Sequence, residues 1–598
     1  MDQNSAEAKP IGLTALSLLA VGVGVITGFG AIFFRGLIGL IHNIFYFGHF
    51  SFAYNANLYT PPSPWGIGII LVPVIGGMGV VFLVSKFAPE ARGHGVPEVM
   101  DAIFYRDGKI RPVVALVKSL ASALAIGTGA AVGREGPIIQ IGASLGSTIG
   151  QIIRMGMWQR ITLVAAGAGA GIAATFNTPI GGVMFAIELM MPEVSVRTFL
   201  PVALATGTAT YLSRLFLGLR PAFDVPSKLF PSQQHVSVET LLLYVVLGAL
   251  AGVASTAFIR GLHAAEGQFA RIRNPYLRHA IGMLGVGLTM YALLLGSGHY
   301  HIDGVGYSTI QDILLGGMVA APLMIGLFVC KLAATSVSLG SGSSGGIFSP
   351  SLFMGATLGG AFGALANMIV PSPDITVAAF AMVGMAAMVG GGTGAAMTAV
   401  TMIFEMTRDY DIVMPMIVAV AVSIGVRRVL SAENIYTIKL VARRHFIPKA
   451  MHANMFLIRL AGDVMEKDFV LLPRDMDFDA VLQRPERDSV FSHIVVTDGE
   501  KIVGTLRVNT SLRRGLEGGY TGATLGDVAS PAFTIAHDDD IMFSVIHRFW
   551  RRQGSMIVVV RGRGVPHASN VVGVITKEHI ADSVAESVRP YAESRMSG

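Results

Sequence analysis

Long apolar runs fill the chain from residue 11 to about residue 440, and they stop there. A helix that crosses a membrane needs about 20 consecutive apolar residues. Several stretches meet that requirement, namely 12–42, 65–86, 236–258 and 411–430. The pattern therefore predicts an all-α polytopic membrane domain over residues 1–450.

Many other apolar stretches are shorter, and glycine or proline interrupts them. They include 111–132, 136–152, 160–176, 179–191, 347–369 and 376–391. Short, broken helices are tolerated at membrane depth only where neighbouring protein or a watery cavity satisfies the freed backbone groups. We therefore expect a transport pathway rather than a simple membrane anchor.

The apolar region also matches itself. PIIQIGASLG at 137–146 and PSLFMGATLG at 350–359 share Pro, Gly, Ala, Leu and Gly. A second match, at nearly the same offset, pairs Gly167, Val183 and Glu188 with Gly384, Val400 and Glu405. Gly-rich apolar sequence can match by chance, but the Pro and Glu positions match as well. We therefore predict a duplication, with halves near 11–217 and 236–440, and a binding site where the broken helices of the halves meet.

After about residue 450 the pattern becomes that of a soluble α/β module. SHIVVTDGEKIVGTLRV at 492–508 predicts a strand, a tight turn and a second strand, and 554–580 repeats this design with a longer turn. The module therefore spans 451–598 as two units, near 460–512 and 524–585. Its position after a membrane domain suggests regulation.

Composition agrees with a membrane protein. Hydrophobic residues make up 52% of the 598 residues, charged residues 14%, and the mean hydropathy is +0.61. A soluble domain carries about 25% charged residues. The basic pairs at 427–428 and 443–444 favour a cytoplasmic C-terminus, in an inner or cell membrane of bacterial type. A pI near 9.3 would also fit nucleic-acid binding, but no basic stripe with interleaved aromatic residues is present, so we expect no such partner.

Three glycine- and proline-bearing segments predict helix starts: GHGVP at 93–97, GREGP at 133–137 and GIFSP at 346–350. Proline suits the first turn of a helix, and glycine lets the backbone approach a ligand. Unpaired N–H groups and the helix dipole make such a start an anion site. Several converging starts would bind an anion loosely enough to release it, as permeation requires.

Glu135 places a carboxylate where the pattern predicts an anion. When ionised it could occupy the anion's site, and when protonated it could leave, so we expect it to gate the path. The alternative is a first-turn glutamate that only stabilises its helix. Lys118 and Arg134 would attract anions or pair with buried carboxylates. Glu188 and Glu405 would handle protons or simply end their helices at the interface.

These segments together resemble the CLC chloride channel/transporter family, over nearly the whole chain. GHGVP, GREGP and GIFSP resemble the family's anion-site motifs in order and spacing. NIYTIKL at 434–440, FNTPIGGVMFAIEL at 176–189 and FEMTRDYDIVMPMI at 404–417 are also characteristic. The C-terminal module resembles a pair of CBS domains.

The resemblance implies a fold of two inverted helical repeats and a homodimer in the lipid bilayer, with one pore per subunit for chloride or a similar small anion. It makes Glu135 the gating glutamate, Tyr436 a pore hydroxyl, and Ile347 and Phe348 backbone amide donors. The remaining anion-binding positions that it implies are His94, Gly95, Gly133, Arg134 and Gly136.

The sequence departs from the family pattern at three places. His94 stands where many members carry a serine that donates to the anion, which opens the choice between chloride and nitrate. Leu189 follows Glu188 where proton-coupled members carry a second glutamate, so we expect channel-like or weakly coupled transport, with stoichiometric chloride/proton exchange as the alternative. His579 and Thr510 stand where nucleotide-binding CBS domains carry an aspartate, which weakens the case for an adenosine nucleotide.

Two other classes compete with anion transport. A CBS-regulated magnesium channel would need intramembrane carboxylates arranged for a hydrated cation. An enzyme would need a catalytic motif, but Ile172 breaks the dinucleotide pattern in GAGAGIAA, GSGSSGG at 340–346 lacks the lysine of a phosphate loop, and no HExxH occurs. His299, His301 and Asp303 have metal-like spacing in a loop. We therefore predict no enzyme activity, no catalytic residues, no metal and no cofactor.

Overall fold

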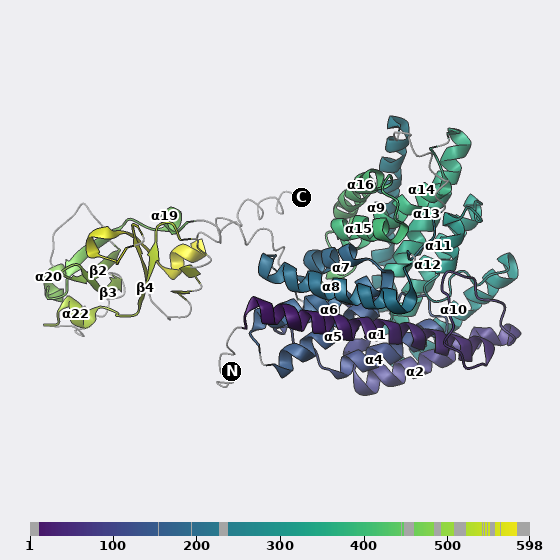
Figure 1. The fold of residues 1–598 in the computed structure, drawn as a ribbon, viewed down its shortest axis with the longest axis horizontal. Helices are drawn as coiled ribbons and strands as arrows, with labels where there is room; N and C mark the ends of the chain where they lie inside the picture. Colours follow the sequence, from purple (N-terminus) through teal and green to yellow (C-terminus); the bar gives the residue numbers. More distant parts are fainter. Residues whose placement is uncertain are drawn as a thin grey trace. The chain divides into compact units, whose positions relative to one another are not determined.

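The computed structural model describes residues 11–447 and 460–582, apart from gaps at 154, 193, 220, 226–236, 373, 444, 446, 483–491, 508–521, 541, 543–544, 547, 550–555 and 563. The chain divides into two compact units. We call Met1–Ile447 the membrane unit and Pro448–Gly598 the C-terminal unit, and we describe each by itself (Figure 1).

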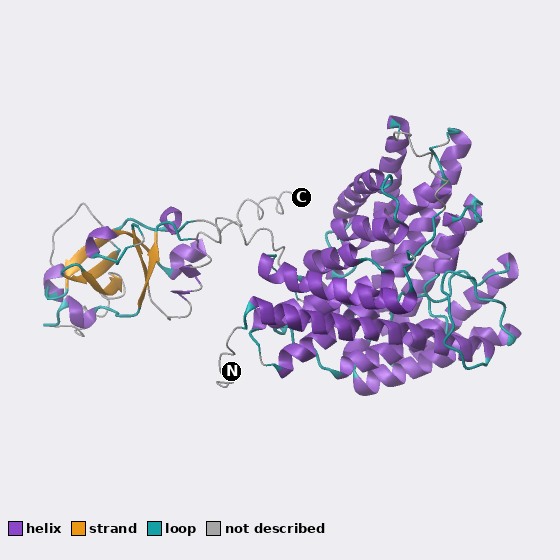
Figure 2. Cartoon of the chain, in the orientation of Figure 1, coloured by secondary structure: helices purple, strands orange, loops and turns teal. Residues whose placement is uncertain are grey.

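The membrane unit consists of helices joined by loops, drawn in purple and teal in Figure 2. Its first half contains α1 Leu13–Phe47, α2 Val72–Phe87, α3 Val96–Tyr105, α4 Val113–Gly127, α5 Glu135–Ile152, α6 Met157–Phe176, α7 Pro179–Phe185 and α8 Val196–Leu217. Its second half contains α9 Val238–Ala270, α10 Pro275–Ser297, α11 Tyr307–Leu314, α12 Ala321–Ser341, α13 Phe348–Ile369, α14 Val377–Thr393, α15 Ala396–Thr407, α16 Val413–Leu430 and α17 Thr437–Ala442. Short helical turns occupy Gly66–Leu71, Pro89–Ala91 and Ala186–Met190.

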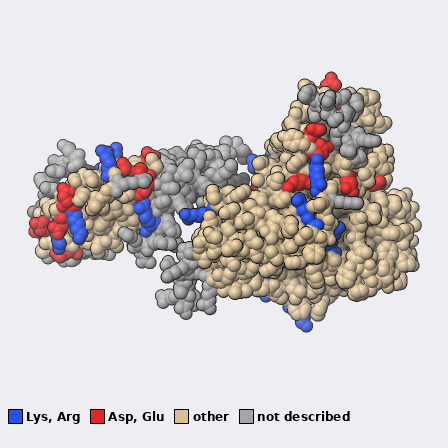
Figure 3. Space-filling model, viewed as in Figure 1, with Lys and Arg blue, Asp and Glu red and all other residues tan. Residues whose placement is uncertain are grey.

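Helix length agrees with a membrane location. Among the described residues, 7 helical stretches are long and apolar enough to cross a membrane, and α4, α14 and α15 are shorter apolar helices. The visible face of the membrane unit carries few charged side chains (Figure 3). Figure 1 shows the helices of the first half, in purple and blue, as one group and those of the second half, in teal and green, as another.

Close glycine contacts hold the central helices together. A Cβ on Gly142 of α5 would overlap the backbone of Gly167 in α6, and the converse is also true. Gly355 of α13 and Gly384 of α14 make the same reciprocal contact. Small residues allow membrane helices to approach closely where no hydrophobic effect drives them together. The two contacts involve glycines that the sequence matches align.

The C-terminal unit contains two three-stranded sheets, drawn in orange in Figure 2. One has the order β1 Phe469–Pro473, β2 His493–Asp498, β3 Lys501–Arg507, and the other β4 Phe533–His537, β5 Met556–Val560, β6 Val571–Ile575. In each sheet the first pair is parallel and the second antiparallel. Short helices lie at Ala461–Val464 (α19), Phe478–Leu482 (α20), Leu525–Val528 (α22) and Ala568–Asn570.

Candidate functional site

The three predicted helix starts meet in the membrane unit. The N–H of Gly133 donates to the carbonyl of Gly346 at 2.7 Å, and the N–H of Gly346 donates back at 2.6 Å. The N–H of Gly93 donates to the carbonyl of Ser343 at 3.1 Å, and that of Gly345 to the carbonyl of Gly93 at 3.3 Å. Segments more than 200 residues apart in the sequence are thus joined by backbone hydrogen bonds.

Two glycines make this approach sterically feasible. A Cβ on Gly136 would overlap the carbonyl oxygen of His94 and crowd the Cα of Gly346. Gly95 has a φ of +82°, a region that other residues rarely adopt. Gly95 and Gly136 therefore act through the backbone geometry that they permit.

Glu135 begins α5 and its side chain is completely buried. Its Oε1 accepts hydrogen bonds of 2.5 Å from both the Tyr307 hydroxyl and the Ser349 hydroxyl, and its Oε2 accepts one of 3.2 Å from the N–H of Ser349. Arg134 Nε lies 4.0 Å from Oε1, and the guanidinium lies over the Tyr307 ring. The Glu135 carboxylate therefore lies against the first turn of α13, where hydrogen-bond donors suited to an anion surround it.

Tyr307 and Ser349 were not among the residues predicted from the sequence. Ser349 lies inside the GIFSP segment, so its hydroxyl could have been proposed with the neighbouring amides. Tyr307 begins α11, directly after Gly304 and Gly306, which both have positive φ. Gly93 and Gly95 precede α3 in the same way. This spacing of two glycines before a helix was the signal for a fourth helix start.

Ile347 is the N-cap of α13 and Phe348 its first residue, and both are buried. N–H groups in the first turn of a helix have no carbonyl partner one turn earlier within it. Their position therefore suits the amide-donor role that the resemblance implies.

His94 and Tyr436 lie together at another part of the site. Their ring centroids are 5.9 Å apart, and both side chains are almost completely buried. Among the described residues, His94 Nδ1 has no hydrogen-bond partner. Asn434 Oδ1 accepts from the N–H groups of Tyr436 and Thr437, and so fixes the start of α17. We call this region the His94 end of the site, and the surroundings of Glu135 the Glu135 end.

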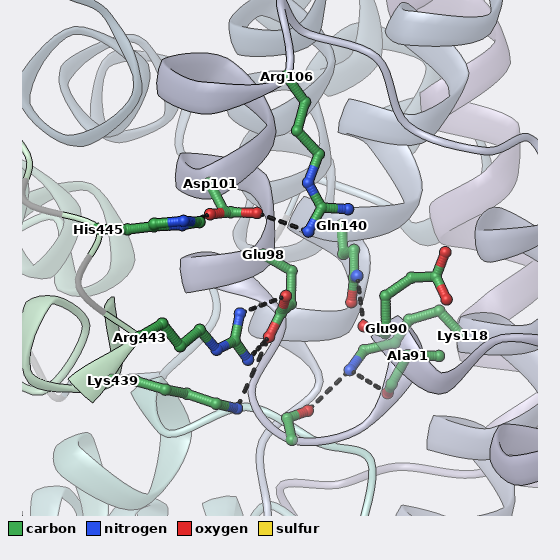
Figure 4. Close-up of polar contacts among 11 residues, drawn as sticks. Glu90, Ala91, Glu98, Asp101, Arg106, Lys118, Gln140, Lys439, Arg443 and His445 are labelled. Carbon is green, nitrogen blue, oxygen red and sulfur yellow. Dashed lines mark hydrogen bonds and ion pairs between the residues drawn. The ribbon is translucent and has the colours of Figure 1, made fainter. Parts of the chain in front are cut away.

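Lys118 lies in α4 and is completely buried. Its ammonium donates to the carbonyl oxygens of Ala91 and Gly93 at 2.9 and 2.7 Å (Figure 4). Lys118 thus holds the loop before α3 by donating to two of its carbonyl oxygens. Lys331 of α12 does the same for the loop before α11, donating to Ile302 and Gly304 at 2.9 Å each.

Glu188 and Glu405 accept hydrogen bonds at helix starts. Glu188 accepts from the N–H groups of Met397 and Thr398 and from the Thr398 hydroxyl, at the start of α15. Glu405 accepts from the N–H groups of Ile180 and Gly181, at the start of α7. Leu189 is partly buried and packs against the core.

The other candidate groups have local partners. His301 Nδ1 lies 3.0 Å from the Thr309 hydroxyl, and Asp303 accepts from the Thr60 hydroxyl. In the part of the chain that the structure describes, no group of three or more His, Cys, Asp or Glu is arranged to hold a metal. His579 of the C-terminal unit lies 2.6 Å from Glu466, whereas Thr510 lies outside the described residues.

A family model described as "Voltage gated chloride channel" matches residues 76–428. The chain belongs to this family. The "H(+)/Cl(-) exchange transporter ClcA" of Salmonella arizonae is 32% identical over 411 residues, which are 68% of this chain and 83% of that protein. The same transporter of Salmonella paratyphi B is also 32% identical over the same shares.

Two solved structures extend the comparison within the voltage gated chloride channel family. A slow cyanobacterial Cl⁻/H⁺ antiporter matches with a TM-score of 0.62 and 25% identity. The match covers 72% of this chain and 97% of the antiporter chain. A eukaryotic CLC transporter has a TM-score of 0.56 and 21% identity, with 95% and 98% coverage. The chain is thus a multi-pass integral membrane protein of a family of channels and transporters, not of enzymes.

Proposed function

We propose that this protein transports chloride across the membrane and that Glu135 gates the path. The observation that carries the proposal is the position of the Glu135 carboxylate, buried and bound by Ser349 N–H, Ser349 Oγ and Tyr307 Oη. An anionic group of the protein thus uses donors that can serve a free anion of the same charge. Chloride and the ionised carboxylate would then compete for one place.

Protonation or displacement of Glu135 would open this place. A neutral carboxyl group loses the charge assistance that makes such hydrogen bonds roughly twice as strong as neutral ones. The side chain then leaves the donors of α13 to a passing anion. Transport should therefore rise as the pH falls.

For the mode of transport we favour channel-like or weakly proton-coupled conduction. Leu189 has no group to carry a proton, and the carboxylate of Glu188 already accepts three hydrogen bonds at the start of α15. The alternative is stoichiometric chloride/proton exchange, which is favoured by the names of the relatives, H⁺/Cl⁻ exchange transporters.

We also propose a fold of two inverted repeats. The equivalent glycine contacts, Gly142–Gly167 and Gly355–Gly384, support a duplication. The two buried lysines that hold equivalent loops, Lys118 and Lys331, support it as well.

The remaining proposals concern assembly and regulation. The protein would form a homodimer, with its C-terminal unit in the cytoplasm as a pair of CBS domains. Two sheets of identical strand order support an internal repeat in that unit. His579 stands at the position where nucleotide-binding CBS domains carry an aspartate, and it is paired with Glu466. We therefore favour a structural role for this unit over nucleotide binding.

The proposal is tested with purified full-length protein in chloride-loaded liposomes. A potassium ionophore relieves the charge that chloride exit would build up, so the protein should release chloride only after its addition. Protein-free liposomes are the control. Absence of anion release from protein-containing liposomes would refute the proposed function.

A further inference from the structure

A cluster of charged side chains ties α17 to α3 beside the His94 end (Figure 4). Glu98 lies in the first turn of α3, one turn after His94, and its side chain is 11% exposed. Its carboxylate accepts two hydrogen bonds from Arg443, at 2.9 and 2.6 Å. This two-pronged geometry is the most directional form of a carboxylate–guanidinium pair.

A second cation shares the same carboxylate. Lys439 Nζ lies 3.7 Å from Glu98 Oε1. A Cβ on Gly93 would lie only 2.9 Å from this ammonium, so Lys439 lies against the loop that carries His94. Lys439 belongs to α17, one turn after Tyr436. Glu98, one turn after His94, is thus paired with Lys439, one turn after Tyr436, and with Arg443.

Asp101 provides a second connection one turn further along α3. Its side chain is 1% exposed, lies 2.5 Å from His445 Nδ1 and 2.8 Å from Arg106. The His445 ring stacks on Tyr105, with centroids 4.2 Å apart. Residues 443 and 445 directly follow α17, so the two connections hold this segment along one side of α3 (Figure 4).

Neither Glu98 nor Arg443 belongs to the anion site described above. We propose that Glu98 is a positioning residue: it ties α17 to α3 through Arg443 and Lys439, and thereby sets the spacing of Tyr436 from His94. The ion pair lies near the protein surface. Its two residues, Glu98 and Arg443, are 345 residues apart in the sequence. The effect on anion passage rests on the proposed function, whereas the tie itself does not.

Two single variants separate positioning from simple charge. Glu98→Gln removes a negative charge and Arg443→Gln removes a positive charge, so their electrostatic effects on an anion have opposite signs. Both variants break the same tie. A positioning role therefore predicts that both change the chloride-to-nitrate permeability ratio in the same direction, by about threefold or more.

The chain offers a matched control. Arg111 donates two hydrogen bonds of 2.6 Å to Glu90 in the same bidentate geometry, and among the described residues no ion pair joins these two side chains to α17. Glu90→Gln and Arg111→Gln should leave the permeability ratio unchanged. The charge-exchanged double variant Glu98→Arg with Arg443→Glu should restore part of the wild-type ratio, because it reforms the pair with the same net charge.

A measurement that does not depend on transport keeps the two proposals apart. Hydrogen–deuterium exchange of the full-length protein should be faster over residues 437–443 in Glu98→Gln and Arg443→Gln than in the wild type and in Glu90→Gln. Unchanged exchange, or ratio changes of opposite sign in the two variants, would overturn the positioning role. Faster exchange in a protein that conducts no anion would retain the tie and refute only the transport function.

Discussion

The Glu135 end and the His94 end differ in how their polar groups are satisfied. At the Glu135 end the protein supplies its own anion, and the carboxylate binds donors from α11 and α13. At the His94 end the imidazole Nδ1 has no partner among the described residues. A side chain of the protein thus occupies the donors at the Glu135 end, whereas a ring nitrogen at the His94 end has no partner among the described residues.

This difference assigns separate tasks to the two ends. A buried polar atom without a partner is unfavourable unless a ligand or water completes it. A carboxylate with three donors is stable until its charge is removed. We therefore expect opening and closing to depend on the Glu135 end, and the choice between anions to depend on the His94 end. The following predictions test this division.

The largest effect is expected for Glu135→Gln. The amide cannot replace the charge-assisted hydrogen bonds, which are worth about 1.5–3 kcal/mol each. Since about 1.4 kcal/mol corresponds to a factor of ten, chloride flux at neutral pH should rise about tenfold or more and lose most of its pH dependence. Liposome flux assays between pH 4.5 and 7.5 measure both quantities.

Glu188→Gln is the matched control for that variant, since this carboxylate also accepts three hydrogen bonds. It should keep the wild-type pH dependence of flux. A wild-type pH profile in Glu135→Gln, or its loss in Glu188→Gln, would contradict the assignment of the gate.

The donors to Glu135 should give an intermediate effect. Tyr307→Phe removes one hydrogen bond to the carboxylate, and Ser349→Ala removes the donating hydroxyl of another. Each loses one charge-assisted hydrogen bond of about 1.5 kcal/mol while Oε1 keeps its second donor, so chloride flux at neutral pH should rise by up to about tenfold. Tyr300→Phe, at a buried tyrosine that accepts from the N–H of Ser63, is the control. A decrease of flux in both donor variants would argue against a competing carboxylate.

A smaller effect is expected at the His94 end. A neutral hydrogen bond contributes about 0.5–1.5 kcal/mol, so His94→Asn should change the chloride-to-nitrate permeability ratio by about two- to tenfold while the pH dependence of flux stays. His279→Asn is the control, because His279 is also buried and its Nε2 has no partner in the part of the chain that the structure describes. Reversal potentials with nitrate on one side give the ratio. An unchanged ratio in His94→Asn would remove His94 from the selectivity site.

The smallest effect concerns His493, a buried histidine of the C-terminal unit, which serves as a reference for His94. Burial lowers the pKa of His493 below its usual 6.5, although Glu466 nearby acts in the opposite sense. The unfolded chain then binds a proton that the folded chain does not, so the C-terminal unit should lose stability as the pH falls below about 6.5. Hydrogen exchange of β2 in the full-length protein at pH 7.5 and 5.5 tests this. The difference in protection between the two pH values should be smaller in His493→Gln than in the wild type. An equal difference in that variant would contradict the prediction.

The sequence was sufficient to predict the membrane domain and the family, because apolar run length and glycine–proline helix starts are local signals. Helix starts at Val96, Glu135 and Phe348 lie within the three predicted segments. The predicted repeat also rests on local signals, namely aligned glycines, and it stays a prediction.

Contacts between distant segments could not be predicted in this way. Nothing local indicates that Tyr307 reaches Glu135, 172 residues earlier, or that Glu188 and Glu405 accept hydrogen bonds at helix starts more than 200 residues away. The alternative roles of Lys118 were open for the same reason. Its partners are carbonyl oxygens of a loop, and a carbonyl partner leaves no mark in the sequence.

The most direct test of the account is the reversal potential of the wild-type protein under an imposed pH difference. We expect chloride to pass the Glu135 gate, and the Leu189 side chain offers no proton acceptor. In planar bilayers with a fixed chloride gradient, the reversal potential should stay near the chloride equilibrium potential and shift little with the pH difference. A reversal potential that moves steadily with the proton gradient would contradict channel-like transport and establish chloride/proton exchange.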